Sequence, residues 1–357
     1  MACEASTFDD IVARGCRVVD PSDIVSVEPL QNFLMMRDNI QVRLAFFDRK
    51  IVVVKKYRRL PDEDSGEYPL HFLWDVGTWS SLHHFNILPL LGISRLDDGF
   101  WVALSPFQPK GNLTTYIRKN PPVSMETKVL WMKEIATGLR YLHEKRVVHG
   151  DLKPDHILVD SRLHLHLCDF ASSLSFPPNV SSAKGFPLPA VHGRYGTAYY
   201  MAPEQVHANH PVQPNRSTDV FAFAVCACEI LADMCNVWGE ESPGKDVYEE
   251  RRNFFAQGRT ATIHRDAPPS LGAMLTKCLQ HEPQKRLAIK DIVKMLESLH
   301  KRLKASAAQK KRLECKAMAT QRGVFKPLTQ AVQNDGDADL LALFDGISAG
   351  SSSDDDT

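Results

Sequence analysis

The sequence predicts an α+β fold of two lobes, a small β-rich lobe followed by a larger α-helical lobe. Three observations lead to this prediction. The first third contains short β-branched runs, the part after residue 124 repeats apolar residues at helical spacing, and a connector at 106–111 lies between them. Because 43% of the 357 residues are hydrophobic, the chain can bury the large core that such a fold needs. The cleft between two lobes is where a ligand is expected.

Three strands and one helix are expected in the first lobe. The β-branched run at 51–54 predicts one strand. Two more are expected at 87–93 and 100–104, because the Asp-Asp-Gly at 97–99 between them is a hairpin signal. The stretch 70–82 predicts a helix between the first strand and the other two.

The second lobe is expected to be mainly helical. Its first helix should begin after Ser124, a residue type that caps helix N-termini, because apolar residues then recur at helical spacing. These residues are Val129, Met132, Ala136, Leu139 and Leu142. Short strands at 147–148 and 157–159 and a Pro- and Ser-rich loop at 172–189 follow, and helical sequence then continues to about 303.

Charge and hydropathy argue against two classes of partner. The formal net charge is +0, from 43 basic and 43 acidic residues, so no overall field draws the chain to nucleic acid or an anionic membrane. The most apolar run, 220–234, is interrupted by Glu229 and Asp233 and is too short to span a bilayer. We therefore expect a buried core helix there, and no nucleic-acid or membrane partner.

The cysteines indicate a reducing compartment. The chain has 8 of them, without a CxxC pair or a cysteine–histidine spacing typical of zinc sites. In a chain of this size the pattern favours buried, reduced thiols over a disulfide framework. The expected location is the cytoplasm, with access to the nucleus left open.

The domain boundaries follow from changes in composition. Residues 1–29 form an N-terminal extension without the apolar stretch of a secretory signal, and residues 30–302 form the domain. Residues 303–357 form a basic and then acidic tail, expected to be largely disordered after its basic part extends the last helix. The apolar segment 340–344 within the acidic part is a candidate docking element for a protein partner. The alternative is a solvated tail without a partner.

Three motifs in a fixed order carry the chemistry. They are HGDLKPDH at 149–156, DFA at 169–171 and APE at 202–204. Together they resemble the catalytic loop, the metal-binding segment and the APE motif of the protein kinase family, over roughly residues 30–300. The resemblance implies a two-lobed protein kinase-like fold. It also implies transfer of the ATP γ-phosphate to a serine or threonine hydroxyl of a protein substrate, with Mg²⁺ as the metal.

The resemblance also assigns roles to charged residues. Phosphoryl transfer passes through an anionic transition state, so the protein mainly positions groups and neutralises charge. Asp151 would accept the proton of the attacking hydroxyl, and Lys153 would contact the transferring phosphate. Asp169 would hold the metal. Lys55 would contact the α- and β-phosphates, with Asp75 as its partner in place of the family's glutamate.

The connector is compatible with adenine binding. By the same resemblance, Ser105 would line the back of the nucleotide pocket, and Pro106 would supply a backbone carbonyl to adenine. Proline lacks an N–H, but the donor N–H would come from Gln108, which has one.

Other positions depart from the family pattern. No glycine occurs from 16 to 65, so Met35, Arg37 and Ile40 stand where three glycines would let the backbone close over phosphates. His156 replaces the asparagine that would hold a second metal. Its imidazole can bind a metal, although magnesium prefers oxygen; the alternative is a loop histidine bonded to backbone.

Two further departures concern the segment after the metal-binding motif. Ala171 replaces a glycine, and Gly150 replaces the arginine that usually receives an activating phosphate. We therefore expect that phosphorylation of this segment is not the main switch. The resemblance also implies that Asp219 steadies the catalytic loop and that Glu204 and Arg286 form a buried ion pair.

Two functions follow. Retention of Lys55, Asp151, Lys153 and Asp169 favours an active serine/threonine protein kinase. The missing glycines, Asp75 and His156 favour a pseudokinase that serves as a nucleotide-binding or scaffold module.

Overall fold

The computed structural model describes most of the chain in eight segments. These are residues 8–13, 15–26, 33–37, 40–57, 70–175, 196–206, 212–239 and 246–323. The chain divides into two compact units, residues 1–303 and 304–357. The first unit contains the α+β fold. The predicted docking element at 340–344 lies outside the described residues.

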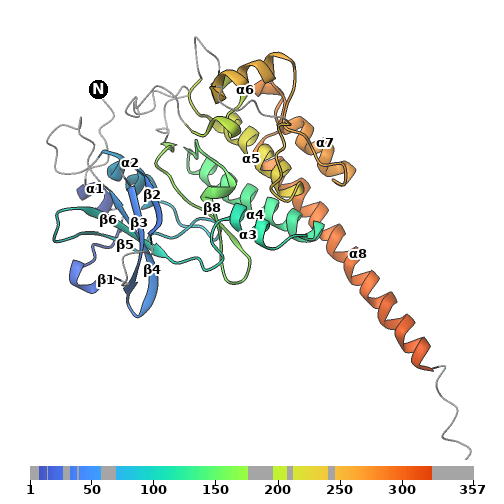
Figure 1. The fold of residues 1–357 in the computed structure, drawn as a ribbon, viewed down its shortest axis with the longest axis horizontal. Helices are drawn as coiled ribbons and strands as arrows, with labels where there is room; N and C mark the ends of the chain where they lie inside the picture. Colours follow the sequence, from blue (N-terminus) through green and yellow to red (C-terminus); the bar gives the residue numbers. More distant parts are fainter. Residues whose placement is uncertain are drawn as a thin grey trace, which may run out of the picture. The chain divides into compact units, whose positions relative to one another are not determined.

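The first lobe is a six-stranded antiparallel sheet with one larger helix, of which the sequence predicts the helix and three strands (Figure 1). The strands run in the order β1-β3-β4-β6-β5, and β2 pairs with β3. Their bounds are β1 Val25–Ser26, β2 Phe33–Arg37, β3 Ile40–Phe47, β4 Lys50–Tyr57, β5 Gly92–Arg95 and β6 Trp101–Pro106. The helices are α1 Phe8–Ala13 and α2 Leu70–Trp79, and a short 3-10 turn, η1, spans Pro21–Asp23.

The period of two in strand β4 positions the lysine of the site. Val52 and Val54 are buried on one face of the sheet, whereas Val53 and Lys55 alternate with them and line a cavity on the other face. The strand is paired on both sides, because β3 and β6 flank it. Lys55 therefore projects from a rigid, central strand.

One predicted strand boundary is wrong. The strand expected at 87–93 begins only at Gly92. The residues before it cross instead to the second lobe, where Leu88 N–H donates to Leu167 O at 2.9 Å and Ile87 bridges to Leu167. Pro89, which has no N–H, also interrupts any ladder there.

The second lobe is mainly helical. Its helices are α3 Leu113–Lys119, α4 Met125–Glu144, α5 Arg216–Leu231, α6 Val247–Ala256, α7 Pro269–Cys278 and α8 Ile289–Gly323. Its short strands are β7 Val147–Val148, β8 Ile157–Val159, β9 Leu165–Leu167 and β10 Leu174–Ser175. Its 3-10 turns are η2 Pro154–His156, η3 Ala198–Tyr200, η4 Pro203–Gln205 and η5 Pro283–Lys285.

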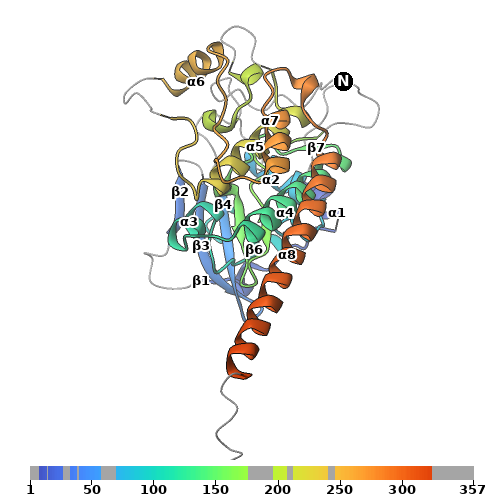
Figure 2. The same cartoon turned by 90° about the vertical axis from the view of Figure 1, so that its right-hand side faces the viewer.

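Several helix predictions are confirmed. The Ser124 side chain accepts the N–H of Thr127 at 3.1 Å and caps α4. Helix α5 is buried along nearly its whole length and contacts both α4 and α7 (Figure 2). The basic residues after 300 belong to α8, which continues to Gly323.

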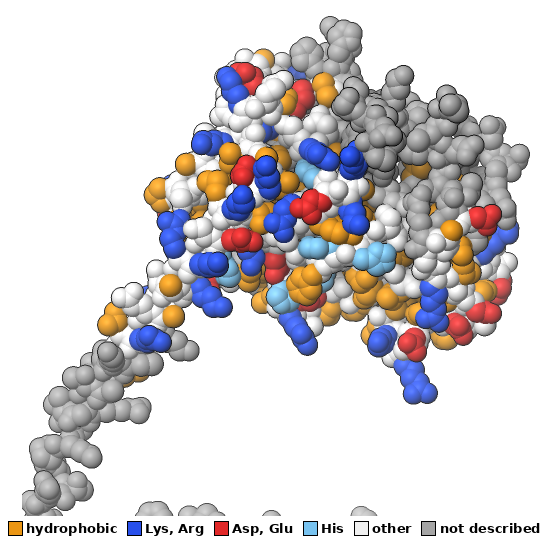
Figure 3. Space-filling model, turned by 180° about the vertical axis from the view of Figure 1, so that it is seen from behind, with side chains coloured by type: hydrophobic (Ala, Val, Ile, Leu, Met, Phe, Trp, Pro, Cys, Tyr) orange, Lys and Arg blue, Asp and Glu red, His pale blue; other side chains and the backbone are white. Residues whose placement is uncertain are grey.

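Basic and acidic side chains are mixed on the surface, in agreement with the even charge balance of the sequence. On the face shown in Figure 3, Lys and Arg side chains lie among Asp, Glu and hydrophobic side chains. Within the part of the chain that the structure describes, no helix combines the length and the apolar character needed to cross a membrane.

Candidate active site

The catalytic loop at 149–156 is fixed by a buried aspartate of helix α5. Asp219 is only 2% exposed, and its carboxylate accepts the backbone N–H groups of His149 at 2.9 Å and Gly150 at 3.0 Å. Its Oδ2 also lies 2.8 Å from His143 Nε2 on α4. The expected anchoring of the loop by Asp219 is confirmed.

Glycine is required at position 150 by a close backbone approach. Gly150 has φ +78°, and a Cβ there would lie 2.3 Å from the carbonyl oxygen of Ser172. The next residue, Ser173, donates from its hydroxyl to His149 O at 3.0 Å. The absence of arginine at this position thus allows the segment after the DFA motif to pack directly on the catalytic loop.

Asp151 and Lys153 form one ammonium–carboxylate pair of the site. Lys153 Nζ lies 3.2 Å from Asp151 Oδ2 and donates to Thr197 Oγ1 at 2.7 Å. Thr197 in turn donates its backbone N–H to Asp151 Oδ1 at 2.8 Å. Thr197, just before the APE motif, therefore fixes both charged groups of the loop.

Lys55 forms the other charged cluster, with two carboxylates. Its Nζ lies 2.5 Å from Asp75 Oδ2 and 2.9 Å from Asp169 Oδ1. Burial alone would lower the pKa of the Lys55 ammonium, but the charges of Asp169 and Asp75 outweigh burial and raise that pKa well above its usual value. Lys55 is therefore a permanent cation at this position.

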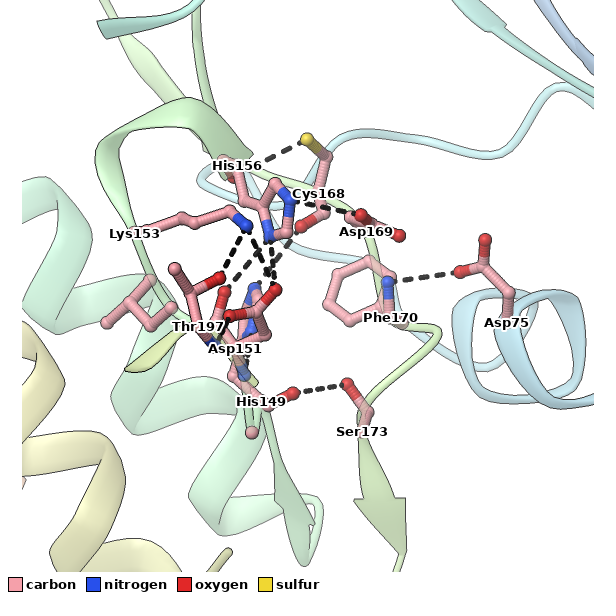
Figure 4. A network of polar contacts seen from close by, with 12 residues as sticks. Asp75, His149, Asp151, Lys153, His156, Cys168, Asp169, Phe170, Ser173 and Thr197 are labelled. Carbon is pink, nitrogen blue, oxygen red and sulfur yellow. Dashed lines mark hydrogen bonds and ion pairs between the residues drawn. The ribbon is translucent and has the colours of Figure 1, made fainter. Parts of the chain in front are cut away.

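The shorter carboxylate at position 75 reaches Lys55 because α2 packs close to the site. Asp75 is fully buried and also accepts from Tyr57 OH at 2.7 Å and from the Phe170 backbone N–H at 3.0 Å. Figure 4 shows Asp75 on its helix pointing toward Phe170. The bonds from Phe170 N–H and from Lys55, which also contacts Asp169, thus hold the DFA segment against α2.

His156 joins the two charged clusters (Figure 4). Its Nδ1 lies 3.0 Å from Asp151 O, and its Nε2 lies 3.1 Å from Asp169 Oδ2. Burial lowers the pKa of His156, and the charges of Asp169 and Asp151 offset this effect only in part. The pKa of Asp169 lies well below its ordinary value because the charge of Lys55 outweighs the effect of burial. His156 therefore contacts backbone, as expected for a loop histidine, and also the carboxylate of Asp169.

A cavity of about 1000 Å³ connects these groups to the connector between the lobes. It is lined at one end by Val42, Val53, Leu88, Ser105, Phe107, Gln108 and Leu158, and at the other by Lys55, Lys153, His156, Cys168, Asp169 and Thr197. Pro106, Asp75 and Asp151 are not among the residues that line it. Asp75 and Asp151 instead contact lining residues, Lys55 and Lys153 respectively.

The cavity continues past the catalytic loop to residues that the sequence did not single out as a site. Glu229, from the buried helix α5, lines this part together with Asp155 and Tyr200. Tyr200 OH donates to Glu229 Oε2 at 2.9 Å, and burial raises the pKa of Glu229 to about 7. The only signal in the sequence was an acidic residue interrupting an apolar run.

The cover of the site is the β2–β3 hairpin, which carries the positions expected to replace glycines. Arg37 pairs with Ile40 and Met35 with Val42 in antiparallel register. Residues 38–39, at the tip, lie outside the described residues. A two-stranded ladder without glycine, whose register shifts between Phe33 and Met35, thus occupies the place of a glycine-rich loop.

A buried ion pair ties the APE motif to Arg286. Arg286 Nη1 and Nη2 donate to the two oxygens of Glu204, each at 2.7 Å, and the Arg286 side chain is 1% exposed. The expected Glu204–Arg286 pair is confirmed.

The geometry agrees with the comparison to known families. The sequence matches the family model of the protein kinase domain over residues 41–296. The chain belongs to the protein kinase family. This membership confirms the two-lobed α+β kinase fold expected from the motifs.

Individual kinases are between a quarter and a third identical to this chain over the aligned residues. Mitogen-activated protein kinase kinase kinase dlk-1 of Caenorhabditis briggsae is 26% identical over 243 residues, which are 67% of this chain and 25% of that protein. Receptor-interacting serine/threonine-protein kinase 1 of Homo sapiens is 32% identical over 157 residues, 43% of this chain and 23% of that protein. Mitogen-activated protein kinase kinase kinase 3 of Arabidopsis thaliana is 28% identical over 228 residues, 61% of this chain and 32% of that protein. The chain thus spans a third or less of each of these relatives.

Proposed function

We propose that this protein is a serine/threonine protein kinase-like phosphotransferase that moves the ATP γ-phosphate to a protein hydroxyl. One observation carries the proposal. Two ammonium–carboxylate pairs, Lys55–Asp169 at 2.9 Å and Lys153–Asp151 at 3.2 Å, lie on the two sides of His156 beside one cavity. One pair suits the phosphates of a nucleotide, and the other suits an attacking hydroxyl.

Each charged residue has a role that its contacts support. Asp151 accepts the proton of the hydroxyl, because one of its oxygens is held by Thr197 and the other faces Lys153. Lys153 neutralises the transferring phosphate. Lys55, held by Asp75, neutralises the α- and β-phosphates.

The adenine end of the cavity is assigned to the connector. Ser105 and Gln108 line the cavity, which supports their placement beside the base. Pro106, which pairs with Val52 in the sheet, contributes through its backbone carbonyl. ATP is thus the proposed cosubstrate.

The metal is assigned to Asp169 and His156. Asp169 Oδ2 and His156 Nε2 lie 3.1 Å apart, so an acceptor oxygen and a ring nitrogen meet at one place and fit a divalent cation. Within the described residues no group of three or more His, Cys, Asp or Glu side chains is placed to hold a metal, so nucleotide phosphates must complete the set. When bound, such a cation, Mg²⁺ by family resemblance, neutralises charge on the phosphates.

A second candidate function is a pseudokinase, a nucleotide-binding or scaffold module. It is favoured by the glycine-free β2–β3 hairpin, which offers strand backbone rather than a phosphate-binding loop. It would keep the cavity and lose the transfer step.

The proposed setting is the cytoplasm, with a protein substrate and, at the acidic tail, a protein partner. The described thiols support a reducing location, since Cys16, Cys226, Cys228 and Cys278 are free and buried. The proposed domain comprises 30–302, with 1–29 and 303–357 as extensions.

A phosphate-incorporation assay tests the proposal. The wild type, Asp151→Asn and Asp266→Asn are incubated with labelled ATP, a divalent metal and a generic protein substrate; Asp266 is 72% exposed and makes the matched control. We expect Asp266→Asn to match the wild type and Asp151→Asn to lose about 100-fold or more. Equal incorporation by all three proteins would reject Asp151 as the base, and ATP binding without incorporation would favour the pseudokinase.

A further inference from the structure

The Asp169–His156 pair brings a ring nitrogen to the carboxylate that is assigned to the metal. The acceptor of His156 Nδ1 is the backbone carbonyl of Asp151, 3.0 Å away. A carbonyl oxygen only accepts, so Nδ1 carries a hydrogen, and Nε2 is the ring nitrogen through which His156 can bind a metal. Nε2 lies 3.1 Å from Asp169 Oδ2.

A nitrogen and an oxygen at this separation match two neighbouring ligands of one metal ion, once Nε2 has released any proton that it carries. Ligand bonds of about 2.1 Å at a right angle place the ligand atoms about 3.0 Å apart. The other oxygen of Asp169 is bound to Lys55, so Oδ2 is the oxygen left for a metal. The hydrogen bond from Nδ1–H to backbone fixes the ring orientation, as the outer partners of metal-binding histidines commonly do.

The nitrogen decides which metal suits the pair. Magnesium prefers six oxygen ligands, whereas imidazole suits first-row transition metals. Cys168, the nearest sulfur, donates its S–H to the backbone oxygen of His156 at 3.4 Å and is thereby directed away from the pair. The ligand set is therefore one nitrogen and one oxygen, without a thiolate.

We propose that His156 makes this site selective for a first-row transition-metal dication over magnesium as the ion that accompanies the nucleotide. The inference rests on the proposed function, because the nucleotide phosphates must supply the remaining ligands. It assigns His156 a direct metal bond through Nε2.

Manganese is the probe, because its electron spin reports bonded nitrogen. Pulsed electron paramagnetic resonance of the full chain with Mn²⁺ and a non-hydrolysable ATP analogue should show coupling to a histidine nitrogen. Labelling the histidines with ¹⁵N should change the coupling frequency. The coupling should vanish in His156→Asn and persist in His83→Asn, a matched change at an exposed histidine.

Calorimetric titration of the same ATP analogue measures the selectivity between Mn²⁺ and Mg²⁺. With saturating metal, we expect binding to be at least about tenfold tighter with Mn²⁺ than with Mg²⁺, the order by which metal surroundings alter affinity. His156→Asn, which restores an oxygen ligand, should reverse or abolish that preference. If this variant does not fold, as judged by its melting curve, the ¹⁵N experiment on the wild type decides alone.

The outcomes separate this inference from the proposed function. Nucleotide binding without nitrogen coupling, or with equal affinity for both metals, overturns the inference and leaves the function standing. Equally tight nucleotide binding in the presence of a chelator also overturns it, because no metal would then connect His156 to the nucleotide. Failure to bind nucleotide with any metal removes the proposed function together with the inference.

Discussion

The catalytic loop and the β2–β3 hairpin both contribute to the cavity, the loop through Lys153 and His156 and the hairpin through Val42. The loop is fixed by polar groups, since Asp219 holds its backbone and Thr197 contacts the side chains of Asp151 and Lys153. The hairpin depends on strand pairing, and among the described strands β2 pairs with β3 alone. Side chains that exchange protons or neutralise charge must be held in a defined position. The β2–β3 hairpin needs only a backbone that can approach the nucleotide.

The largest effect should come from breaking the ion pair between Glu204 of the APE motif and Arg286. Arg286→Ala removes both bonds to Glu204 and leaves a carboxylate without its cation in a buried place. We expect a loss of about 3–5 kcal/mol in the free energy of unfolding, measured by denaturant titration. Lys285→Ala, at a 60% exposed ion pair, is the control and should cost less than about 1 kcal/mol. A loss at Arg286 no greater than the control would show that the pair does not stabilise the fold.

The second-largest effect should come from disturbing the contact between the catalytic loop and the segment after the DFA motif. Gly150→Ala would place a Cβ 2.3 Å from Ser172 O, whereas Gly99→Ala, at nearly the same φ of +81°, meets nothing within 4 Å. The control should lose about 1–2 kcal/mol from backbone strain alone. Gly150→Ala should lose about 1 kcal/mol more and reduce phosphate incorporation. Equal melting temperatures of the two variants would contradict the close approach.

A smaller effect concerns the acidic end of the cavity. The pKa of Glu229 is raised to about 7, so the folded state holds its proton to higher pH than the unfolded state does. Its stabilising contribution is complete below about pH 4.5 and is lost as the pH rises through about 7. Glu229→Gln removes this dependence, so the variant should gain up to about 2 kcal/mol relative to the wild type between these pH values. The exposed control Glu249→Gln should follow the wild-type curve, and an identical curve for Glu229→Gln would contradict the raised pKa.

The smallest effect sharpens the role of the cover. Arg37→Gly introduces a glycine into β2 opposite Ile40, where the family has its glycines. Closer backbone approach should tighten ATP-analogue binding by about two- to tenfold, the value of one added hydrogen bond, at a cost of under about 1 kcal/mol in stability. Phe46→Gly, on β3 at a 44% exposed position, should weaken the strand without tightening binding. Unchanged affinity in Arg37→Gly calorimetry would show that the side-chain ladder does not limit the cover.

Much of the fold could be predicted because local signals agreed with tertiary structure. Ser124 caps α4, and the run at 51–54 lies within β4, since capping and period-two patterns are properties of short segments. The strand expected at 87–93 failed because residues near Ile87 pair with Leu167, a partner far along the chain. An apolar run does not show which backbone it will meet.

The features of the site also divide into those that the sequence could predict and those that depend on the folded structure. The motifs placed Asp151, Lys153 and Asp169, and the resemblance gave Lys55 its partner Asp75. The link made by His156 between the catalytic and metal-site carboxylates depends on a ring orientation that no spacing encodes. Likewise, the exclusion of a side chain at Gly150 depends on the path of the chain at Ser172, which only the folded structure fixes.

The central claim is that the two ammonium–carboxylate pairs serve one reaction. Single-turnover transfer from labelled ATP, measured for Asp151→Asn, Asp169→Asn and the double variant, tests it most directly. Residues that act as one unit lose activity non-additively, so the double variant should be no slower than the slower single variant. Losses that multiply, or single variants as fast as the wild type, would contradict the account.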